Sequence, residues 1–332
     1  MIRDLYSLPK VDLHVHLEGS IRPATLSDLA DRYGVTKPQA LSRDRWAFAN
    51  FSDFIEQYVW SCECLRAPED FVRIAREFCE DEARQGTRYA EVTFTIASHA
   101  VRYADDWDMP IEAVLEGFKA GEETTGVRCR LVLDHARGFP MELADATLEA
   151  ALRHQDGVVA LGLGADERFP PEPYGPVFQR ALGAGLHSVP HAGEAAGPAS
   201  VWGALRSLGA ERIGHGVRAL EDPLLVAELR DRQVPLEVCV TSNVETAVVP
   251  SLGQHPLRQL LDAGLVVTLN SDDPAMFNSP LLGEYELARE TFSMTDEELS
   301  AIALAGVRAS FMESESKVRL EAEIDEWLQD DE

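Results

Sequence analysis

The sequence predicts a (β/α)8 TIM barrel, an α/β fold, with a helical flap over its carboxyl-terminal face and extra helices near the end of the chain. Two observations support this prediction: eight short apolar segments are typical of strands, and helical periodicity fills the intervals between them. Strands and helices that alternate in this number are the element order of the barrel. An open doubly wound sheet is the alternative, and it is disfavoured because no glycine-rich phosphate-binding fingerprint follows any strand.

The predicted elements alternate along most of the chain. The strands are expected at residues 10–16, 88–96, 127–134, 156–163, 185–190, 211–215, 234–239 and 265–270. Apolar residues spaced three and four apart predict helices at residues 70–85, 109–121, 142–154, 174–184, 199–208, 221–231 and 255–263. Asp70 is the expected cap of the first of these helices.

Two segments lie outside the regular alternation of strand and helix. Residues 17–69 carry helical patterns before the second strand, and we expect them to form a lid over the barrel mouth. Residues 281–328 follow the eighth strand and are expected to form the C-terminal helices. Because barrels of this length are often a single domain, residues 1–332 are predicted to form one domain.

The composition indicates a globular chain with an acidic surface. The formal net charge of -27 repels nucleic acid polymers and anionic membranes, so we expect neither as a partner. Five cysteines, an odd number spread along the chain, favour free thiols in a reducing compartment. No stretch approaches the roughly 18 apolar residues of a membrane span, so a cytoplasmic location is expected. The oligomeric state stays open.

Histidines and acids stand where the predicted strands end. His14 and His16 share one face of the first strand, because side chains alternate along a strand. His191, His215 and Asp272 end the fifth, sixth and eighth strands. In a barrel these strand ends meet at the face that carries the active site, so the five side chains are expected to converge.

His14, His16, His191 and Asp272 form the expected metal shell. Three imidazoles and one carboxylate suit Zn²⁺, one ion per chain, with a further position for water. Fe²⁺ or another metal stays possible, since the ligand types do not exclude it. None of the four lysines lies near the end of the fourth strand to bridge two ions, and although Glu167 could do so, a mononuclear site is favoured.

Three further residues are candidates for the chemistry. Glu194 follows His191 by three positions, and it is either an acid at a helix N-terminus or a general acid whose pKa burial raises; we favour the second interpretation. His215 can orient the attacking water or serve as another metal ligand. Asp273 stands beside Asp272 and is free to accept a hydrogen bond from substrate.

At these motifs the chain resembles the adenosine deaminase family of barrel hydrolases over nearly its whole length. The resemblance rests on LPKVDLHVHLEGS at 8–20, HAGE at 191–194, IGHG at 213–216 and SDDP at 271–274. It implies zinc-dependent hydrolytic removal of the 6-amino group of a purine, with release of ammonia. In that reaction Glu194 protonates N1, Asp273 holds N7, His215 assists the water that attacks C6, and Asp272 belongs to the catalytic set.

Several positions bear on the substrate. The family's vertebrate-type enzymes have Asp, near the ribose 5′ oxygen, where this chain has Glu18; Glu resembles the branches that act on adenine or on 6-aminodeoxyfutalosine. Ala165 stands where the family usually offers a glycine N–H to purine N3. Phe51, Phe54 and Tyr58 resemble the family's apolar gate over the purine, although plain helix packing also explains their spacing.

The expected substrate is an adenine nucleoside, either adenosine or a 5′-modified one such as 6-aminodeoxyfutalosine, and free adenine is the alternative. The carboxylate of 6-aminodeoxyfutalosine needs a cation, for which Arg66, Arg137 and Arg168 are candidates, although surface ion pairing is the simpler role for each. A catalytically inactive purine-binding protein is disfavoured because the set of motif residues is complete. A binuclear hydrolase of cyclic amides is disfavoured because the bridging lysine is absent.

Overall fold

The computed structural model describes residues 3–38, 41, 46, 48, 51–103 and 106–329, with the side chains of helix α2 described from Asp53 onward. All strand pairs are parallel, in the orders β1-β2-β3-β4-β5 and β6-β7-β8-β9. The strands are β1 (Lys10–His16), β2 (Thr87–Phe94), β3 (Arg128–Arg137), β4 (Val158–Ala165), β5 (His187–Ser188), β6 (His191–Ala192), β7 (Ile213–His215), β8 (Leu236–Val238) and β9 (Val267–Leu269).

Backbone hydrogen bonds close these strands into a barrel. At the seam between the first and last strands, the His16 N–H donates to the Asp272 carbonyl at 2.7 Å, and the Asp272 N–H donates to the His14 carbonyl at 2.9 Å. The fifth barrel strand consists of β5 and β6. Expecting one strand over 185–190 was wrong, because Pro190 interrupts the ladder, having no N–H to donate.

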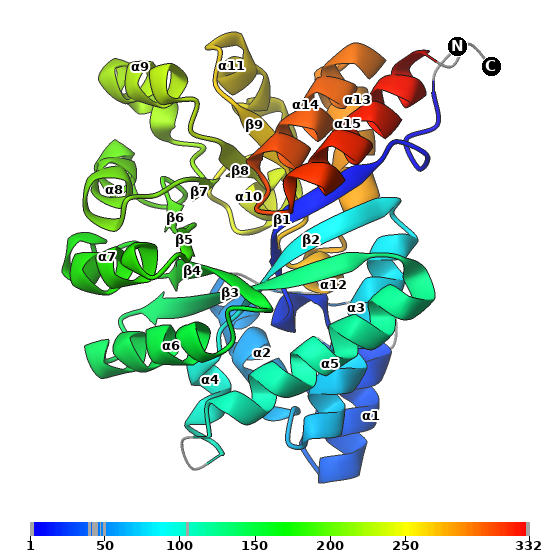
Figure 1. Cartoon of the computed structure of the whole chain (residues 1–332), viewed down its shortest axis with the longest axis vertical. Helices are drawn as coiled ribbons and strands as arrows, with labels where there is room; N and C mark the ends of the chain where they lie inside the picture. Colours follow the sequence, from blue (N-terminus) through cyan, green and yellow to red (C-terminus); the bar gives the residue numbers. More distant parts are fainter. Residues whose placement is uncertain are drawn as a thin grey trace.

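Helices alternate with the strands along the chain, and most of them lie around the outside of the strands (Figure 1). In chain order they are α3 (Pro68–Ala83), α4 (Ala97–Ala100), α5 (Asp108–Thr125), α6 (Met141–Arg153), α7 (Gly175–Gly183), α8 (Pro198–Gly203), α9 (Pro223–Arg232), α10 (Val240–Glu245), α11 (Leu257–Asp262) and α12 (Pro274–Phe277). Short helical turns lie at η2 (Glu172–Tyr174), η4 (Ala219–Glu221) and η5 (Leu252–Gln254), and a π-helical turn, η3 (Ala204–Leu208), continues α8. The (β/α)8 fold is therefore confirmed.

Helix α3 begins earlier than expected, and its capping differs. Its N-cap is Ala67 and Pro68 is its first residue, so the expectation that Asp70 stands at the N-cap was wrong. Asp70 is instead the third helical residue, and its carboxylate accepts from the N–H groups of Arg66 and Ala67. The acid still satisfies free amides at the helix start, but it reaches back to them from inside the helix.

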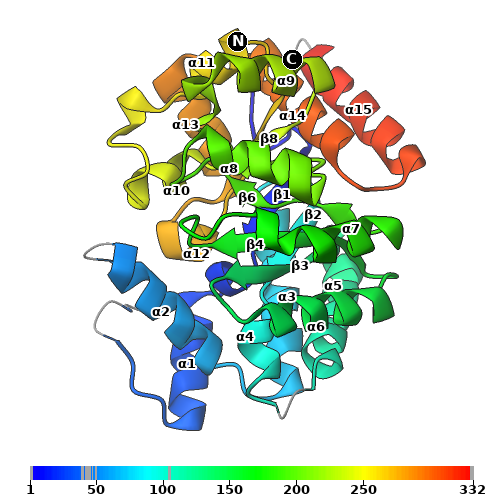
Figure 2. The ribbon, with the colours of Figure 1, turned by 90° about the vertical axis from the view of Figure 1, so that its left-hand side faces the viewer.

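Two groups of helices lie outside the alternating repeat. Within 17–69 the structure has η1 (Glu18–Ser20), α1 (Pro23–Tyr33) and α2 (Phe51–Glu63), and α1 and α2 lie together at one corner of the molecule (Figure 2). After β9 come α13 (Leu281–Phe292), α14 (Asp296–Ala309) and α15 (Ser314–Gln329). Helix α14 packs against both β1 and β9, so it covers the seam of the barrel.

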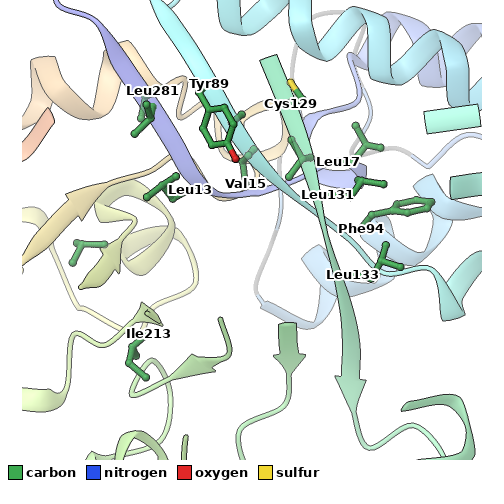
Figure 3. Packing of buried hydrophobic residues seen from close by; sticks show 14 of the residues in the cluster. Leu13, Val15, Leu17, Tyr89, Phe94, Cys129, Leu131, Leu133, Ile213 and Leu281 are labelled. Carbon is green, nitrogen blue, oxygen red and sulfur yellow. The ribbon is translucent and has the colours of Figure 1, made fainter. Parts of the chain in front are cut away.

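Because side chains alternate along β1, one face of the strand packs into the hydrophobic core and the other faces the site. Val11, Leu13 and Val15 are buried, and they belong to the hydrophobic cluster between the strands and the helices (Figure 3). A methyl group of Val11 lies within 2.8 Å of the Cβ position that Gly306 on α14 lacks, so this face of β1 meets the outer helices. His14 and His16 lie on the opposite face and point into the barrel mouth. No helix among the described residues is long and apolar enough to cross a membrane.

Candidate active site and metal centre

Four side chains converge at the mouth of the barrel. His14, His16, His191 and Asp272 each offer one ligand atom, and all four atoms lie within 4.8 Å of one another. The Nε2 atoms of His16 and His191 are 3.3 Å apart. Asp272 Oδ1 is 3.3 Å from His16 Nε2 and 3.6 Å from His14 Nε2. The structure thus brings together the whole set that the sequence proposes as metal ligands.

This geometry fits a metal ion. Atoms bound at about 2.0–2.1 Å to a tetrahedral Zn²⁺ lie roughly 3.3 Å apart, close to the separations found here. His14 Nε2 is buried and has no hydrogen-bond partner among the described residues. Burial lowers the pKa of both His14 and His191, which favours the neutral imidazole that a metal requires. The residues therefore fit a divalent cation.

The orientation of His14 depends on two residues that the motifs do not reveal. His14 Nδ1 hydrogen-bonds Glu237 Oε2 at 2.9 Å, and Glu237 on β8 is also paired with the buried guanidinium of Arg212. Arg212 donates in addition to Glu91 at 2.6 Å. Burial alone would raise the pKa of Glu237, but Arg212 and His14 lower it, so this carboxylate is ionised and directs His14 Nε2 toward the cluster.

Close packing at Gly214 lets His14 reach its position. A Cβ atom on Gly214 would lie 2.6 Å from a ring carbon of His14, closer than two such atoms can approach. The glycine before His215 is thus required by the metal ligand on β1, which explains part of the Ile213-Gly214-His215-Gly216 motif.

Glu194 and His215 lie beside the cluster. His215 Nε2 is 3.7 Å from Glu194 Oε2 and 3.9 Å from Asp272 Oδ2. Burial raises the pKa of Glu194, although the neighbouring His215 opposes this shift. A carboxyl in such a place holds a proton closer to neutral pH than a surface glutamate does, as a general acid must.

Asn243 on α10 fixes the ring of His215. Asn243 Nδ2 donates to His215 Nδ1 at 3.1 Å, which leaves Nε2 to face Glu194 and Asp272. The other end of the amide, Oδ1, is 3.1 Å from Nε2 of the buried His255. Burial lowers the pKa of His255 to about 4, so the neutral ring donates to this oxygen and fixes which way the amide points.

Asp273 offers a buried carboxyl oxygen without a protein partner. Its Oδ1 atom is buried and receives no hydrogen bond from the described residues. It lies against Gly19, where a Cβ atom would come within 1.8 Å of Oδ1. Burial and the charge of Asp272 raise the pKa of Asp273 well above its usual value. Because a raised pKa favours the protonated carboxyl, this group can donate a hydrogen bond to a ligand.

Three of the expected site residues have a left-handed backbone. The φ angles are +65° at Ala165, +60° at His215 and +62° at Asp272. This conformation is unfavourable for residues other than glycine, and it is concentrated here at the carboxyl ends of barrel strands. The turns aim the side chains of His215 and Asp272 across the mouth. Ala165 is exposed there at the end of β4.

Glu18 is enclosed between the barrel and the flap. Its Oε1 atom accepts from the Thr95 N–H at 3.1 Å and pairs with His99 Nε2 at 3.0 Å. Its Oε2 atom lies 3.4 Å from the hydroxyl of Tyr58 on α2. The thiol of Cys62 is also near Glu18 and His99. Glu18 thus links the first strand to the helix above it.

The three residues of the expected gate have different surroundings. The ring of Tyr58 lies 6.5 Å from that of His16, next to the metal cluster. Phe54 is buried and packs on Phe277 with ring centroids 4.7 Å apart. The side chain of Phe51 lies outside the described part of the chain. Of these residues, Tyr58 comes nearest to the place where a substrate must sit.

The three candidate arginines are not alike. Arg137 is buried and donates to the backbone carbonyls of His191 and Phe169, so it braces the end of β6. Arg168 is exposed and paired with Asp166, and Arg66 is exposed beside Tyr33. Among the described residues, no hydrogen bond or ion pair joins one of these guanidinium groups to a side chain of the metal cluster, because Arg137 binds His191 at its backbone carbonyl.

Asp134 is a further residue of the site that the motifs do not indicate. It lies within β3, three residues before the strand ends, and is buried; it accepts from the Thr95 hydroxyl at 2.6 Å. Burial raises its pKa to about 6, with His16 acting in the opposite direction. The available sequence signal was an acid directly after the apolar run at 131–133, and Glu237 is likewise an acid between apolar residues.

A cluster of three imidazoles and a carboxylate at the carboxyl-terminal rim of a (β/α)8 barrel, beside a buried acid, is the arrangement of a metal-dependent barrel hydrolase. Comparison with known proteins makes this more specific. The family model described as adenosine deaminase matches residues 9–327. This chain belongs to the adenosine deaminase family, and it is an aminohydrolase.

Relatives of the chain match it over nearly the full length of both partners. It is 41% identical over 337 residues to an aminodeoxyfutalosine deaminase of Streptomyces avermitilis, covering 98% of this chain and 94% of the relative. It is 36% identical to an adenosine deaminase of Shigella flexneri, covering 96% and 98%. The crystal structure of an adenine deaminase from Arthrobacter aurescens superposes with a TM-score of 0.91 at 31% identity, covering 97% and 99%. The expected family, fold and enzyme class are confirmed.

Proposed function

We propose that the protein hydrolyses the 6-amino group of an adenine nucleoside to the 6-oxo purine and ammonia. The observation that carries this proposal is the convergence of the four ligand atoms of His14, His16, His191 and Asp272 beside the raised-pKa carboxyl of Glu194. A metal site alone fits many hydrolases. The adjacent acid supplies the proton that a purine nitrogen must gain before the amino group leaves.

The chain's residues have separate roles in this reaction. Glu194 gives its proton to N1 of the purine, which makes C6 more electrophilic. His215, whose Nδ1 accepts from Asn243, carries its hydrogen on Nε2 and orients the attacking water through that N–H. Glu194, ionised once N1 has its proton, takes the proton that the water loses and passes it to the leaving amino group. Asp273 donates to purine N7 as the protonated acid through its unpartnered Oδ1, and the backbone N–H of Ala165 donates to N3. Phe54 and Tyr58 cover the purine from the flap.

Zn²⁺ is the ion we propose for the site, at one per chain. Three imidazoles and a carboxylate with tetrahedral spacing suit Zn²⁺, and His14, His16, His191 and Asp272 together supply the four ligand atoms that one ion needs. When bound, the ion supplies positive charge that lowers the pKa of water toward neutrality.

We propose 6-aminodeoxyfutalosine as the preferred substrate, followed by adenosine and then adenine. The relative at 41% identity is an aminodeoxyfutalosine deaminase, and those at lower identity include adenosine deaminases. Glu18 supports a 5′-modified nucleoside, since its longer side chain reaches Tyr58 and narrows the space that a free 5′-hydroxyl would occupy. Adenine is retained as the alternative because of the adenine deaminase fold match.

The five buried free thiols favour a reducing compartment, and we propose the cytoplasm as the location of this small-molecule enzyme.

One kinetic panel tests this proposal. Values of kcat/KM are measured by purine absorbance for 6-aminodeoxyfutalosine, adenosine, 2′-deoxyadenosine, 5′-methylthioadenosine and adenine. We expect 6-aminodeoxyfutalosine to react fastest and adenine to react slowest. If adenine exceeds every nucleoside by about tenfold, a difference of about 1.4 kcal/mol in transition-state binding, the proposed order is wrong. If no compound reacts, the proposed activity itself is wrong.

A further inference from the structure

We propose that Glu167 is a positioning residue that fixes the backbone of Glu194, and that it does not bridge a second metal ion. This inference rests on the proposed role of Glu194 as the general acid. Glu167 lies two residues beyond the end of β4, and its side chain extends to the loop that follows β6. It is 6% exposed, so its charge depends on partners inside the protein.

Both oxygens of the Glu167 carboxylate are fully used. Oε1 accepts from the Gly193 N–H at 2.8 Å and from the Ser200 hydroxyl at 2.6 Å. Oε2 accepts from the N–H groups of Glu194 at 3.0 Å and Ala196 at 2.7 Å. A carboxylate has about four acceptor sites, and four donors fill them here. A metal ion would have to displace amides that have no other partner.

The loop held by these bonds contains the proposed acid. Residues 193–197 connect β6 to α8 without regular structure, and the turn begins at Gly193 with φ +71°. On the carbonyl side, Arg218 donates through its backbone N–H to Gly193 at 3.0 Å and through its guanidinium to Ala195. The amides thus bind Glu167 and the carbonyls bind Arg218, so the loop is held from both sides.

The contact requires a full-length carboxylate. Glutamine has one acceptor oxygen, and its NH₂ group would face amide N–H donors that it cannot bind. Aspartate is one methylene shorter and cannot reach all four donors. The charge of Glu167 also acts in the same direction as burial on the pKa of Glu194, raising it. Glu167 therefore supports the acid through both position and charge.

The test combines kinetics with the metal content of the holoenzyme. We expect Glu167→Gln to lower kcat by about 10²-fold, since a displacement near 1 Å can cost that much, with KM and one metal ion per chain unchanged. Asp166→Asn is the matched control, because the neighbouring carboxylate pairs with Arg168 at the surface, and it should retain wild-type kcat. In a Glu194→Gln background, Glu167→Gln should cause little further loss, because both changes remove the same function.

A second readout needs no substrate. Hydrogen exchange at the amides of residues 193–196 should be faster in Glu167→Gln than in wild type or Asp166→Asn, and unchanged exchange overturns the inference even if the proposed reaction is wrong. A kcat within threefold of wild type overturns it, as does a full additional loss in the Glu194→Gln background. If wild type holds two metal ions per chain and Glu167→Gln holds one, Glu167 bridges two ions and the inference is wrong. If Glu167→Gln does not fold, Glu167→Asp replaces it, with the same exchange and kinetic criteria.

Discussion

At the scale of single residues, the site consists of groups whose states are set by neighbours from other strands. His14 is directed by Glu237, which is itself held ionised by Arg212. His215 is oriented by Asn243, and Glu194 is kept protonatable by burial. The orientation or the protonation state of each of these groups is thus fixed by its surroundings. A preorganised site requires this.

Changing Glu194 to Gln should remove the proton donor and leave the binding site intact. We expect kcat to fall by about 10²–10⁴-fold, the usual contribution of a general acid–base group, while metal content and KM stay close to wild type. Steady-state kinetics and metal analysis of the purified protein measure these effects. Glu142→Gln, an exposed change on α6, is the control. A variant with more than a tenth of wild-type kcat would show that Glu194 is not the acid.

The sequence predicted the residues of the cluster but not those that orient them. His14, His16, His191 and Asp272 stand in short motifs at strand ends, so their convergence follows from the barrel alone. Glu237 and Arg212 stand in no such pattern. Their pairing depends on the register of neighbouring strands, which sequence spacing does not specify. Asn243 ends the segment 239–243, which resembles a Cys-Pro-x-Ser-Asn segment of the family, but that resemblance does not show that Asn243 orients His215.

At the scale of elements, a buried acid fastens α13 to α10. Glu284 is 1% exposed and accepts from the N–H groups of Val240 at 2.8 Å and Thr241 at 3.3 Å. Burial raises its pKa to about 7, although these hydrogen bonds oppose the shift. Because the folded pKa is raised, the stability that this group contributes is present below its unfolded pKa of 4.5 and is lost as pH rises through 7.

Glu284→Gln should therefore change the pH dependence of stability. Glutamine stays neutral at every pH. Between pH 5 and pH 8 the free energy of unfolding of wild type should therefore fall, relative to that of the variant, by up to about 3 kcal/mol. Urea unfolding at both pH values measures the difference. Glu286→Gln, exposed on the same helix, should show no such gain. An equal difference between Glu284→Gln and wild type at both pH values would contradict the assignment.

The elements also show where periodicity is insufficient. Hydrophobic runs located all eight barrel strands, because parallel strands buried on both faces are nearly continuous in apolar residues. The same runs could not show that Pro190 splits the fifth strand into β5 and β6, since an apolar proline looks like part of the run. Helix starts shifted by one to two residues, as at Asp108, because capping depends on local backbone geometry.

At the scale of the whole molecule, the proposed metal ligands come from three separate places around the barrel. His14 and His16 lie on β1, His191 on β6, and Asp272 follows β9. Two of these places face each other across the seam, where backbone bonds join His14 and His16 to Asp272. Side-chain bonds of Asp12 and Asn270 join the same two segments. An ion held by the proposed ligands would link both sides of this seam.

Removal of the ion should therefore lower global stability as well as activity. A ligand at a hundredfold its Kd stabilises the folded state by about 2.7 kcal/mol, so chelation should lower Tm and abolish turnover. His16→Ala should have this lower Tm before any chelator is added, and chelator should not lower its Tm further. His154→Ala, which changes a partly buried histidine paired with Asp108 away from the site, should respond as wild type does. Full activity without metal would refute the proposed mechanism.

The seam also sets an order of events during biosynthesis. The ribosome makes His14 and His16 first, whereas Asp272 emerges only after four-fifths of the 332 residues have been made. A nascent chain shorter than this carries at most the three proposed histidine ligands, and the complete set of proposed ligands exists only when the eighth barrel strand reaches the first. Metal acquisition should follow translation, and prematurely terminated chains should leave the cell's zinc supply untouched.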